Sequence, residues 1–350
     1  MPFANPPQAR FGLPTALVLF ALSLIFALAL AEGALRLLGF QPWQPAGVWA
    51  PDVDPEHETP LMTRPHATRS WTNQPGTYRY AGYSAEVDSI SVTINADESR
   101  STGRSPPPSG APALVFTGGS NTMGWAISDH ETYPWKLQQR FPRNPVFNWG
   151  VPGYGSLQAL LTLEEQLGQV DGRKIAFYGL IGHHYNRNVL HKNWMRLFAA
   201  PGKGRMPPYA TLDASGTLQR HPPGQWRPWP LKDRLAIVNA AENAAIRLLA
   251  RRRGAQMVPV MHGLLQQMQR AASRHDAALV VVLLKLDPAR ADALEAFLAN
   301  AGIRVLNCVP DDLGPQYRVK GEGHPNDALN TLWAGCIAGY LEREFRLDSQ

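Results

Sequence analysis

Cysteine is scarce in this chain, with only Cys308 and Cys336 among 350 residues. A disulfide-rich scaffold is therefore excluded. A single bridge in an oxidising compartment and two buried thiols both remain open. Dense runs of one charge are also missing, although the formal net charge is +6. The short Arg251-Arg252-Arg253 run ends a helical pattern and is typical of a solvated helix face, so we expect no nucleic-acid partner.

The sequence contains no internal repeat. Its 44% hydrophobic content is that of an ordinary globular protein, which argues against wholesale disorder. The length leaves room for one large domain with additions, or for two domains.

An uncharged apolar run occupies Phe11 to Leu30. As a helix these 20 residues would span about 30 Å, the hydrocarbon thickness of a bilayer. Arg10 before the run, with Glu32 and Arg36 after it, gives a weak bias towards a cytoplasmic N-terminus. The sequence therefore predicts a single-pass membrane anchor with the remaining chain exported.

A cleaved signal peptide is the alternative, because Ala29-Leu30-Ala31 resembles a cleavage site. We favour the uncleaved anchor, because the apolar run is longer than a usual signal core. The helical pattern also continues through the following residues, AEGALRLLGF.

The segment after the anchor differs in composition from the rest of the chain. Residues 41–75 are rich in Pro and Trp and predict irregular structure, whereas the alternation around Ile90 and Val92 suggests one or two strands within 76–95. A polar Pro/Gly/Ser linker follows at 99–112. We divide the chain into a cytoplasmic N-terminus (1–10), an anchor helix (11–38), a juxtamembrane segment with short strands and linker (39–112), and a catalytic domain (113–346).

From residue 113 onward, predicted strands and helices alternate. The strands at 113–117, 174–181 and 278–285 are continuously apolar. Apolar strands without alternation are typical of a parallel sheet that is covered on both faces. The fold class is therefore α/β, with three layers. An irregular stretch at 190–230 predicts a surface insertion.

In a parallel sheet, the functional residues lie at the carboxyl ends of the strands. The first strand ends at GGSNTMG, where Gly118-Gly119 permits a tight turn and Ser120 follows it. The second ends at NWGVPGYG, where Gly153 offers a bare backbone N–H. The third ends at GHHYNRN, and a late loop carries Glu322 and His324. A serine, oxyanion donors and a histidine with a carboxylate are the parts of an acyl-transfer site.

These blocks resemble those of the SGNH or GDSL-type hydrolases, over about residues 113–345. GGSNTMG resembles the first block, NWGVPGYG the second and GEGHPNDALN the last. The resemblance implies a flavodoxin-like parallel sheet. It is strongest to bacterial membrane-anchored members, which have an N-terminal helix and a periplasmic catalytic domain and so imply a single-pass protein of the bacterial inner membrane. Some of them handle O-acetyl groups on cell-surface polysaccharides.

Three positions depart from the family pattern. Gly119 replaces the usual Asp, and Glu322 stands where an Asp orients the histidine. In the third block, His184 occupies the position of the family's Asn, which donates to the oxyanion. Asn186 or Asn188 could instead fill this role from a longer loop, and we rank His184 first and Asn186 second.

We therefore expect catalysis by Ser120, His324 and Glu322, with an oxyanion hole formed by Ser120, Gly153 and a third-block donor. The expected substrate is an acyl ester, and the resemblance favours the acetyl ester of an envelope polysaccharide. Hydrolysis and transfer to a sugar hydroxyl both remain open. The alternative is a catalytically silent envelope protein that binds glycan or a partner through the same cleft.

Other side chains suggest ligands with less support. His183, His184 and His191 lack the companions of a typical zinc site, so we expect neither metal nor cofactor. The tryptophans at 43, 49, 71, 226 and 229 could form a surface that stacks against sugars. The alternatives are a membrane-interface position for Trp43 and Trp49 and a loop-packing role for Trp226 and Trp229.

Overall fold

The computed structural model describes residues 12–44, 62–82, 89–103, 110–191, 194–195, 205–225 and 227–348. The predicted cytoplasmic residues 1–10, Trp49 and Trp226 lie outside this set. The chain forms two compact units, Met1–Val48 with Arg227–Leu248, and Trp49–Trp226 with Leu249–Gln350. The segment boundaries predicted from the sequence remain predictions, because compactness does not measure independent folding.

The larger unit is built on a five-stranded sheet in which every pairing is parallel. Its strands are β5 (Ala113–Gly118), β6 (Val146–Gly150), β7 (Lys174–Ile181), β12 (Ala277–Lys285) and β13 (Arg304–Asn307). The spatial order β13-β12-β7-β5-β6 is the flavodoxin-like order 2-1-3-4-5. Every residue of β5 and β7 is buried, which explains their unbroken apolar runs. The predicted α/β fold class is confirmed.

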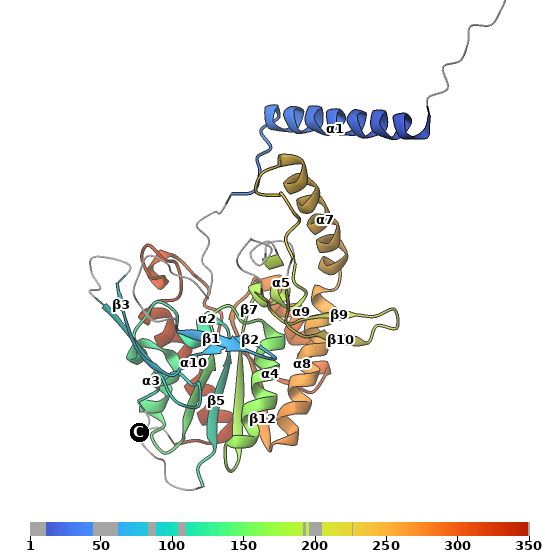
Figure 1. Cartoon of the computed structure of the whole chain (residues 1–350). Helices are drawn as coiled ribbons and strands as arrows, with labels where there is room; N and C mark the ends of the chain where they lie inside the picture. The colour runs from blue at the N-terminus through green and yellow to red at the C-terminus, as the bar shows by residue number, and fades with distance from the viewer. Residues whose placement is uncertain are drawn as a thin grey trace, which may run out of the picture. The chain divides into compact units, whose positions relative to one another are not determined.

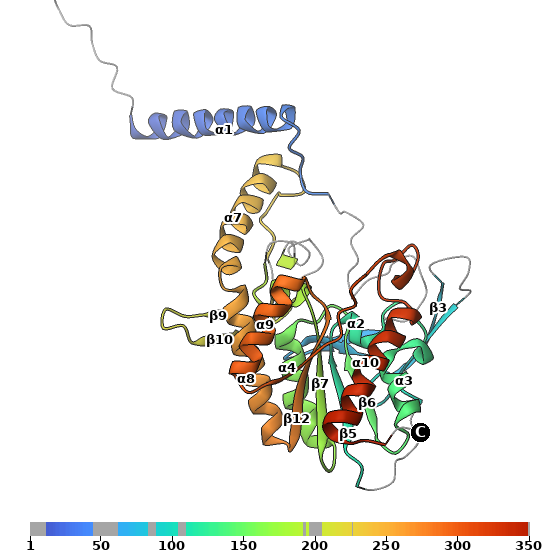
Figure 2. The same cartoon turned by 180° about the vertical axis from the view of Figure 1, so that it is seen from behind.

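Helices cover both faces of this sheet (Figures 1 and 2). One face packs against α4 (Ser156–Gln166), α8 (Met257–Arg274) and α9 (Pro288–Asn300), whose inward side chains include Leu160, Leu264 and Leu294. The other face packs against α3 (Tyr133–Arg140) and α10 (Asp327–Phe345) through residues such as Leu137 and Trp333. Fully burying one such apolar side chain stabilises the fold by about 2 kcal/mol. The predicted three layers are present.

Two antiparallel hairpins precede the sheet: β1 (Thr63–His66) with β2 (Ser70–Asn73), and β3 (Gly76–Ala81) with β4 (Ser89–Ile94). The strands expected within 76–95 are confirmed, whereas the irregular structure expected at 41–75 is wrong for 63–73. Trp71 and Asn73 provide the physical reason. Trp71 Nε1 donates to Pro152 O at 2.9 Å, and Asn73 Nδ2 donates to Gly150 O at 3.0 Å. Trp71 is buried, so it offers no surface for sugar stacking.

A buried arginine anchors the segment that follows β4 to the sheet unit. Arg100 is fully buried, and its guanidinium donates to Met123 O at 3.0 Å and to Ile127 O at 2.7 Å. It also pairs with Asp129 Oδ1 at 2.8 Å. Together with the carbonyl of Gly124, these carbonyl and carboxylate partners satisfy the buried charge. Arg100 thereby fixes the chain just after Ser120.

The predicted insertion at 190–230 contains short antiparallel ribbons in its described part. β8 (Arg205–Met206) pairs with β11 (Gly224–Gln225), and β9 (Tyr209–Leu212) pairs with β10 (Leu218–His221). The remaining short elements are α2 (Ser120–Met123), η1 (Asp129–Glu131), η2 (Leu167–Gln169), α5 (His183–Asn188) and η3 (Pro315–Tyr317). Helix α7 (Ala236–Gly254) belongs in part to each compact unit.

The smaller unit contains α1 (Leu13–Leu37), whose mean hydropathy of 2.5 and 25 residues suffice to cross a membrane. None of its described residues is buried, and a signal sequence would have the same properties. Glu32, near its end, accepts hydrogen bonds from Ala236 N and Ile237 N, both at 2.9 Å. Arg36 bonds Glu32 at 2.6 Å and donates to Arg234 O at 2.8 Å. The end of α1 is thus joined to the start of α7.

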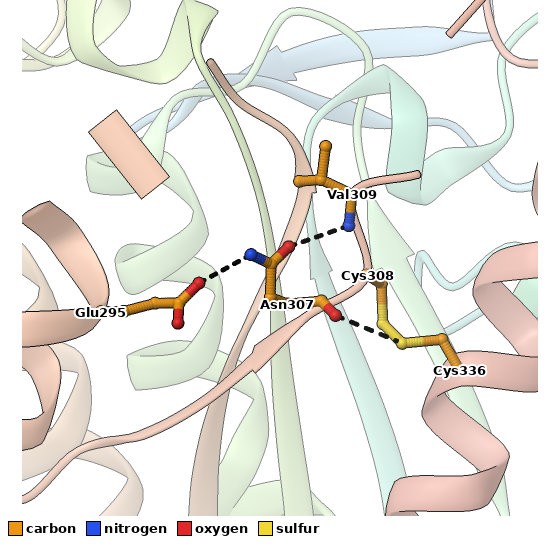
Figure 3. Close-up of a disulfide and its surroundings, with 5 residues drawn as sticks. All are labelled: Glu295, Asn307, Cys308, Val309 and Cys336. Atoms are coloured by element: carbon orange, nitrogen blue, oxygen red, sulfur yellow. Dashed lines mark hydrogen bonds between the residues drawn. A yellow bond between two sulfur atoms is a disulfide. The ribbon is translucent and has the colours of Figure 1, made fainter. Parts of the chain in front are cut away.

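The two cysteines form a disulfide, with a Cα–Cα distance of 5.9 Å (Figure 3). Cys308 directly follows β13, and Cys336 lies on α10. The side chain of Asn307 bonds Glu295 Oε1 at 2.7 Å and Val309 N at 3.0 Å, which holds the end of β13 beside the bridge. Of the two alternatives left open by the sequence, the structure contains the bridge. It closes a loop of the chain that includes Glu322 and His324.

Candidate active site

Ser120 lies at the turn where β5 passes into α2. A Cβ at Gly118 would collide with the Thr122 side chain and lie 2.9 Å from Gly179 O, so only glycine fits there. The turn brings Ser120 to the carboxyl end of the sheet, at the first position of α2, where its backbone N–H has no carbonyl to bond within the helix.

Ser120, His324 and Glu322 form a continuous hydrogen-bonded chain. Ser120 Oγ lies 3.0 Å from His324 Nε2, and His324 Nδ1 lies 2.7 Å from Glu322 Oε1. Because an ionised carboxylate only accepts, Nδ1 carries the proton and Nε2 presents its lone pair to the serine hydroxyl. This is the arrangement in which an imidazole can remove the serine proton.

The loop of Glu322 and His324 is held by its own hydrogen bonds. His324 N donates to Glu322 Oε2 at 2.8 Å, and Val319 N donates to His324 O at 2.7 Å. Trp125 Nε1 donates to Glu322 Oε1 at 3.1 Å. Burial raises the pKa of Glu322, but the hydrogen bonds and charge of His324 and the bond from Trp125 together lower it by more. The pKa of Glu322 therefore lies below its usual value. The carboxylate is therefore ionised at neutral pH.

The sequence analysis missed Trp125. It lies five positions after Ser120 and contacts a residue nearly 200 positions away, so no local pattern indicates its role.

The backbone N–H groups of Ser120 and Gly153 belong to the segments that follow β5 and β6. The loops after β5 and β6 are joined by a hydrogen bond from Val151 N to Gly118 O at 3.1 Å. Gly153 has φ +82°, and a Cβ there would lie 3.0 Å from the Trp71 ring. Among the described residues, neither Ser120 N nor Gly153 N donates a hydrogen bond. Both donors are free for a substrate oxygen.

The third block forms α5, whose candidate donors differ in their surroundings. His184 is fully buried, and its Nδ1 lies 2.6 Å from the Tyr178 hydroxyl. Burial and the nearby Arg187 charge hold the pKa of His184 well below its usual value, so the ring is neutral. Its Nε2 has no partner among the described residues and lies 3.0 Å from the position of a Cβ built on Gly119. Tyr178 donates its hydroxyl proton to Ser156 Oγ at 2.6 Å, so His184 Nδ1 donates to the Tyr178 oxygen and Nε2 presents a lone pair; Nε2 carries the proton only when the Tyr178 hydroxyl turns to His184.

The two asparagines of the third block are placed differently. Asn186 is exposed, and its side chain makes no hydrogen bond to the described part of the chain. Asn188 is buried, and its Oδ1 accepts from Ser156 N at 2.7 Å, which caps the start of α4. The structure therefore brings His184 to Gly119 and uses Asn188 in the fold. The assignment of His184 as the oxyanion donor remains a prediction.

Arg187 is a second residue that the sequence analysis did not assign to the site. Its Nη1 donates to Tyr154 O at 2.8 Å and lies 3.3 Å from the position of a Cβ built on Gly119. Its guanidinium packs over the Trp194 ring, 4.8 Å from the centroid. Burial lowers the pKa of Arg187 to about 10, so it is still charged at neutral pH. A cation therefore lies beside the serine turn.

No protein-family model matches the chain, and no curated protein matches it. Two solved structures are similar to it. A member of the lipolytic protein G-D-S-L family from Veillonella parvula DSM 2008 is 14% identical, covers 67% of this chain and 100% of its own length, and gives a TM-score of 0.40. A putative lipolytic protein of the G-D-S-L family from Desulfitobacterium hafniense DCB-2 is 13% identical, with coverages of 65% and 98% and a TM-score of 0.35. These values assign neither a family nor a residue role, so the site is interpreted from its own hydrogen bonds.

Proposed function

We propose that the protein is a serine esterase or O-acyltransferase with Ser120 as its nucleophile. The observation that carries this proposal is the chain from Ser120 Oγ through His324 to Glu322, with distances of 3.0 Å and 2.7 Å. Ser120 is about 200 positions from Glu322 and His324 in the sequence, and the fold brings the three side chains together in the order that nucleophilic acyl transfer requires.

In the proposed reaction, His324 Nε2 removes the Ser120 proton while Ser120 Oγ attacks an ester carbonyl. Glu322 stabilises the imidazolium that forms. The N–H groups of Ser120 and Gly153 hold the tetrahedral oxyanion, and His184 Nε2 becomes a third donor when the Tyr178 hydroxyl donates to His184 Nδ1. The imidazolium then protonates the departing alcohol, and an acyl-enzyme on Ser120 remains. Loss of one oxyanion donor typically raises such a barrier by about 3 kcal/mol.

The acyl-enzyme is resolved by water or by a sugar hydroxyl, and His324 serves as the base in either case. We propose the acetyl ester of an envelope polysaccharide as the substrate. The supporting observations are the apolar helix α1, which suits a protein tethered to the bacterial inner membrane, and the Cys308–Cys336 bridge, which suits an oxidising exterior. The catalytic unit would then lie in the periplasm.

The proposal is tested with the full-length protein in detergent and 4-nitrophenyl acetate as substrate. We expect turnover by the wild type and its loss in Ser120→Ala. Ser273→Ala is the matched control, because Ser273 is exposed and lies at the end of α8 that leads into the start of β12, away from the carboxyl ends of the strands. Equal turnover in Ser120→Ala would contradict the proposal. No turnover at all would favour a glycan-binding protein that does not catalyse.

A further inference from the structure

Arg187 lies close to the nucleophile and has no counter-ion among the described residues. Gly119 adjoins Ser120, and a Cβ placed on Gly119 would lie 3.3 Å from Arg187 Nη1. The guanidinium is therefore within about 9 Å of the Ser120 Cα. Its one hydrogen bond among the described residues goes to the carbonyl of Tyr154, next to Gly153. The cation thus lies between the two loops that supply the backbone N–H donors.

No carboxylate of the described residues pairs with Arg187. The chain that follows it, residues 189–204, contains no Asp or Glu. The carboxylate of Glu322 is engaged by His324 and Trp125. Gly119 has no side chain, so it supplies no acidic group in the space that Arg187 and His184 approach. A partly buried guanidinium without an anion retains most of its donors for a ligand.

A second positive group, Lys285, lies at the same strand ends, next to His183, whose pKa is lowered by burial and by the neighbouring charges. His183 follows β7, and Lys285 ends β12. The two strand ends are joined by a bond from Gly182 N to Lys285 O at 2.9 Å. The charges of Arg187 and Lys285 act on His183, and that of Arg318 acts on Lys285. Clustered positive charge beside a cleft attracts anions and raises their local concentration.

We propose that the ester substrate carries a carboxylate or similar anionic group, which Arg187 binds beside the scissile ester. This inference rests on the proposed function and narrows its substrate to negatively charged esters. The planar guanidinium suits a carboxylate, because it can donate two parallel hydrogen bonds to it. An anion would also compensate the desolvated charge that the protein leaves unpaired.

The charge can lie on the acyl side or on the alcohol side of the ester, and two matched pairs of substrates separate these cases. Mono-4-nitrophenyl succinate is compared with its neutral methyl ester for the acyl side. 4-Acetoxybenzoate is compared with its methyl ester for the alcohol side. We expect the anionic member of one pair to have a kcat/KM about tenfold or more above its neutral counterpart, as one charge-assisted interaction provides.

Arg187→Gln should abolish this preference and change the neutral esters by only a few-fold. Arg290→Gln is the matched control for net charge, because Arg290 lies on α9 over the Tyr185 ring. The preference should persist in that variant. Three results would overturn the inference: no preference in the wild type, an equal loss on both members in Arg187→Gln, or the same loss of preference in Arg290→Gln.

Binding provides a test that is independent of turnover. Two anions are titrated calorimetrically into full-length Ser120→Ala, with and without Arg187→Gln. Monomethyl succinate represents the acyl side, and 4-hydroxybenzoate represents the alcohol side. We expect one of them to bind only when Arg187 is present. Absence of turnover on every ester, with this binding intact, would refute the esterase proposal and keep the anion site. Absence of binding, with neutral esters turned over, would refute the anion site alone.

Discussion

Replacement of Glu322 by glutamine removes the charge that faces His324 while nearly preserving side-chain volume. The carboxylate lies 2.7 Å and 2.9 Å from His324 Nδ1 through its two oxygens and also accepts from His324 N at 2.8 Å. In the proposed mechanism, the imidazole is neutral before the attack and positive in the transition state. The lost interaction therefore raises the barrier more than it weakens substrate binding.

The expected size of this effect follows from the distance and the exposure of the pair. The side chains of His324 and Glu322 are 31% and 15% exposed, so the pair is neither dry nor fully hydrated. Two unit charges with centres about 4 Å apart interact by about 1 kcal/mol in water and about 4 kcal/mol at an effective dielectric constant of 20. A value near 3 kcal/mol corresponds to a loss of about 100-fold in kcat.

The assay is steady-state hydrolysis of 4-nitrophenyl acetate by the wild type and Glu322→Gln. We expect kcat to fall by about 100-fold and KM to change little. Glu295→Gln is the matched control, since Glu295 accepts a hydrogen bond from Asn307 near the disulfide and none from Ser120 or His324. A Glu322→Gln enzyme with wild-type kcat would refute the reasoning, because the carboxylate would then have no part in stabilising the imidazolium.

Three other perturbations have defined outcomes. The double variant Cys308→Ser/Cys336→Ser should lose about 3.5 kcal/mol of unfolding free energy in urea denaturation, since the bridge joins residues 28 positions apart; an unchanged midpoint would contradict a stabilising role. Trp125→Phe removes the 3.1 Å bond to Glu322 and should lower kcat by about tenfold, whereas Trp229→Phe, at an exposed position of the smaller unit, should have wild-type kcat. Because the folded-state pKa of Glu322 is depressed, its stabilisation is present above the usual value of 4.5 and is lost as the pH falls through the folded-state pKa; the stability gap between wild type and Glu322→Gln should close on acidification, and a gap that widens would contradict this sign.

The sheet and the position of the serine could be predicted because they depend on local patterns. Continuous apolar runs such as 278–285 predict buried parallel strands, and β12 occupies 277–285. The glycines at 118 and 119 mark the turn after the first strand. Since parallel strands end at one edge, Ser120, Gly153 and the third block were expected to lie together.

Other parts of the site depend on contacts between distant residues, which no local pattern encodes. Trp71 bonds a carbonyl 81 positions away, and it lies in a segment whose Pro and Trp content predicts irregular structure. The third block shows the same limit. His184, Arg187 and Asn188 are close in sequence, but helix α5 directs one to Gly119, one to Tyr154 and one to the start of α4. The sequence also left the disulfide open, because it is the packing of α10 beside the end of β13 that brings the cysteines together.

The role of Ser120 as nucleophile is tested most directly by labelling the full-length protein with a fluorophosphonate probe and identifying the modified peptide by mass spectrometry. We predict a single adduct on Ser120, absent in Ser120→Ala and formed much more slowly in His324→Ala. An adduct on a different serine, or equal labelling of Ser120→Ala, would contradict the assignment of the nucleophile.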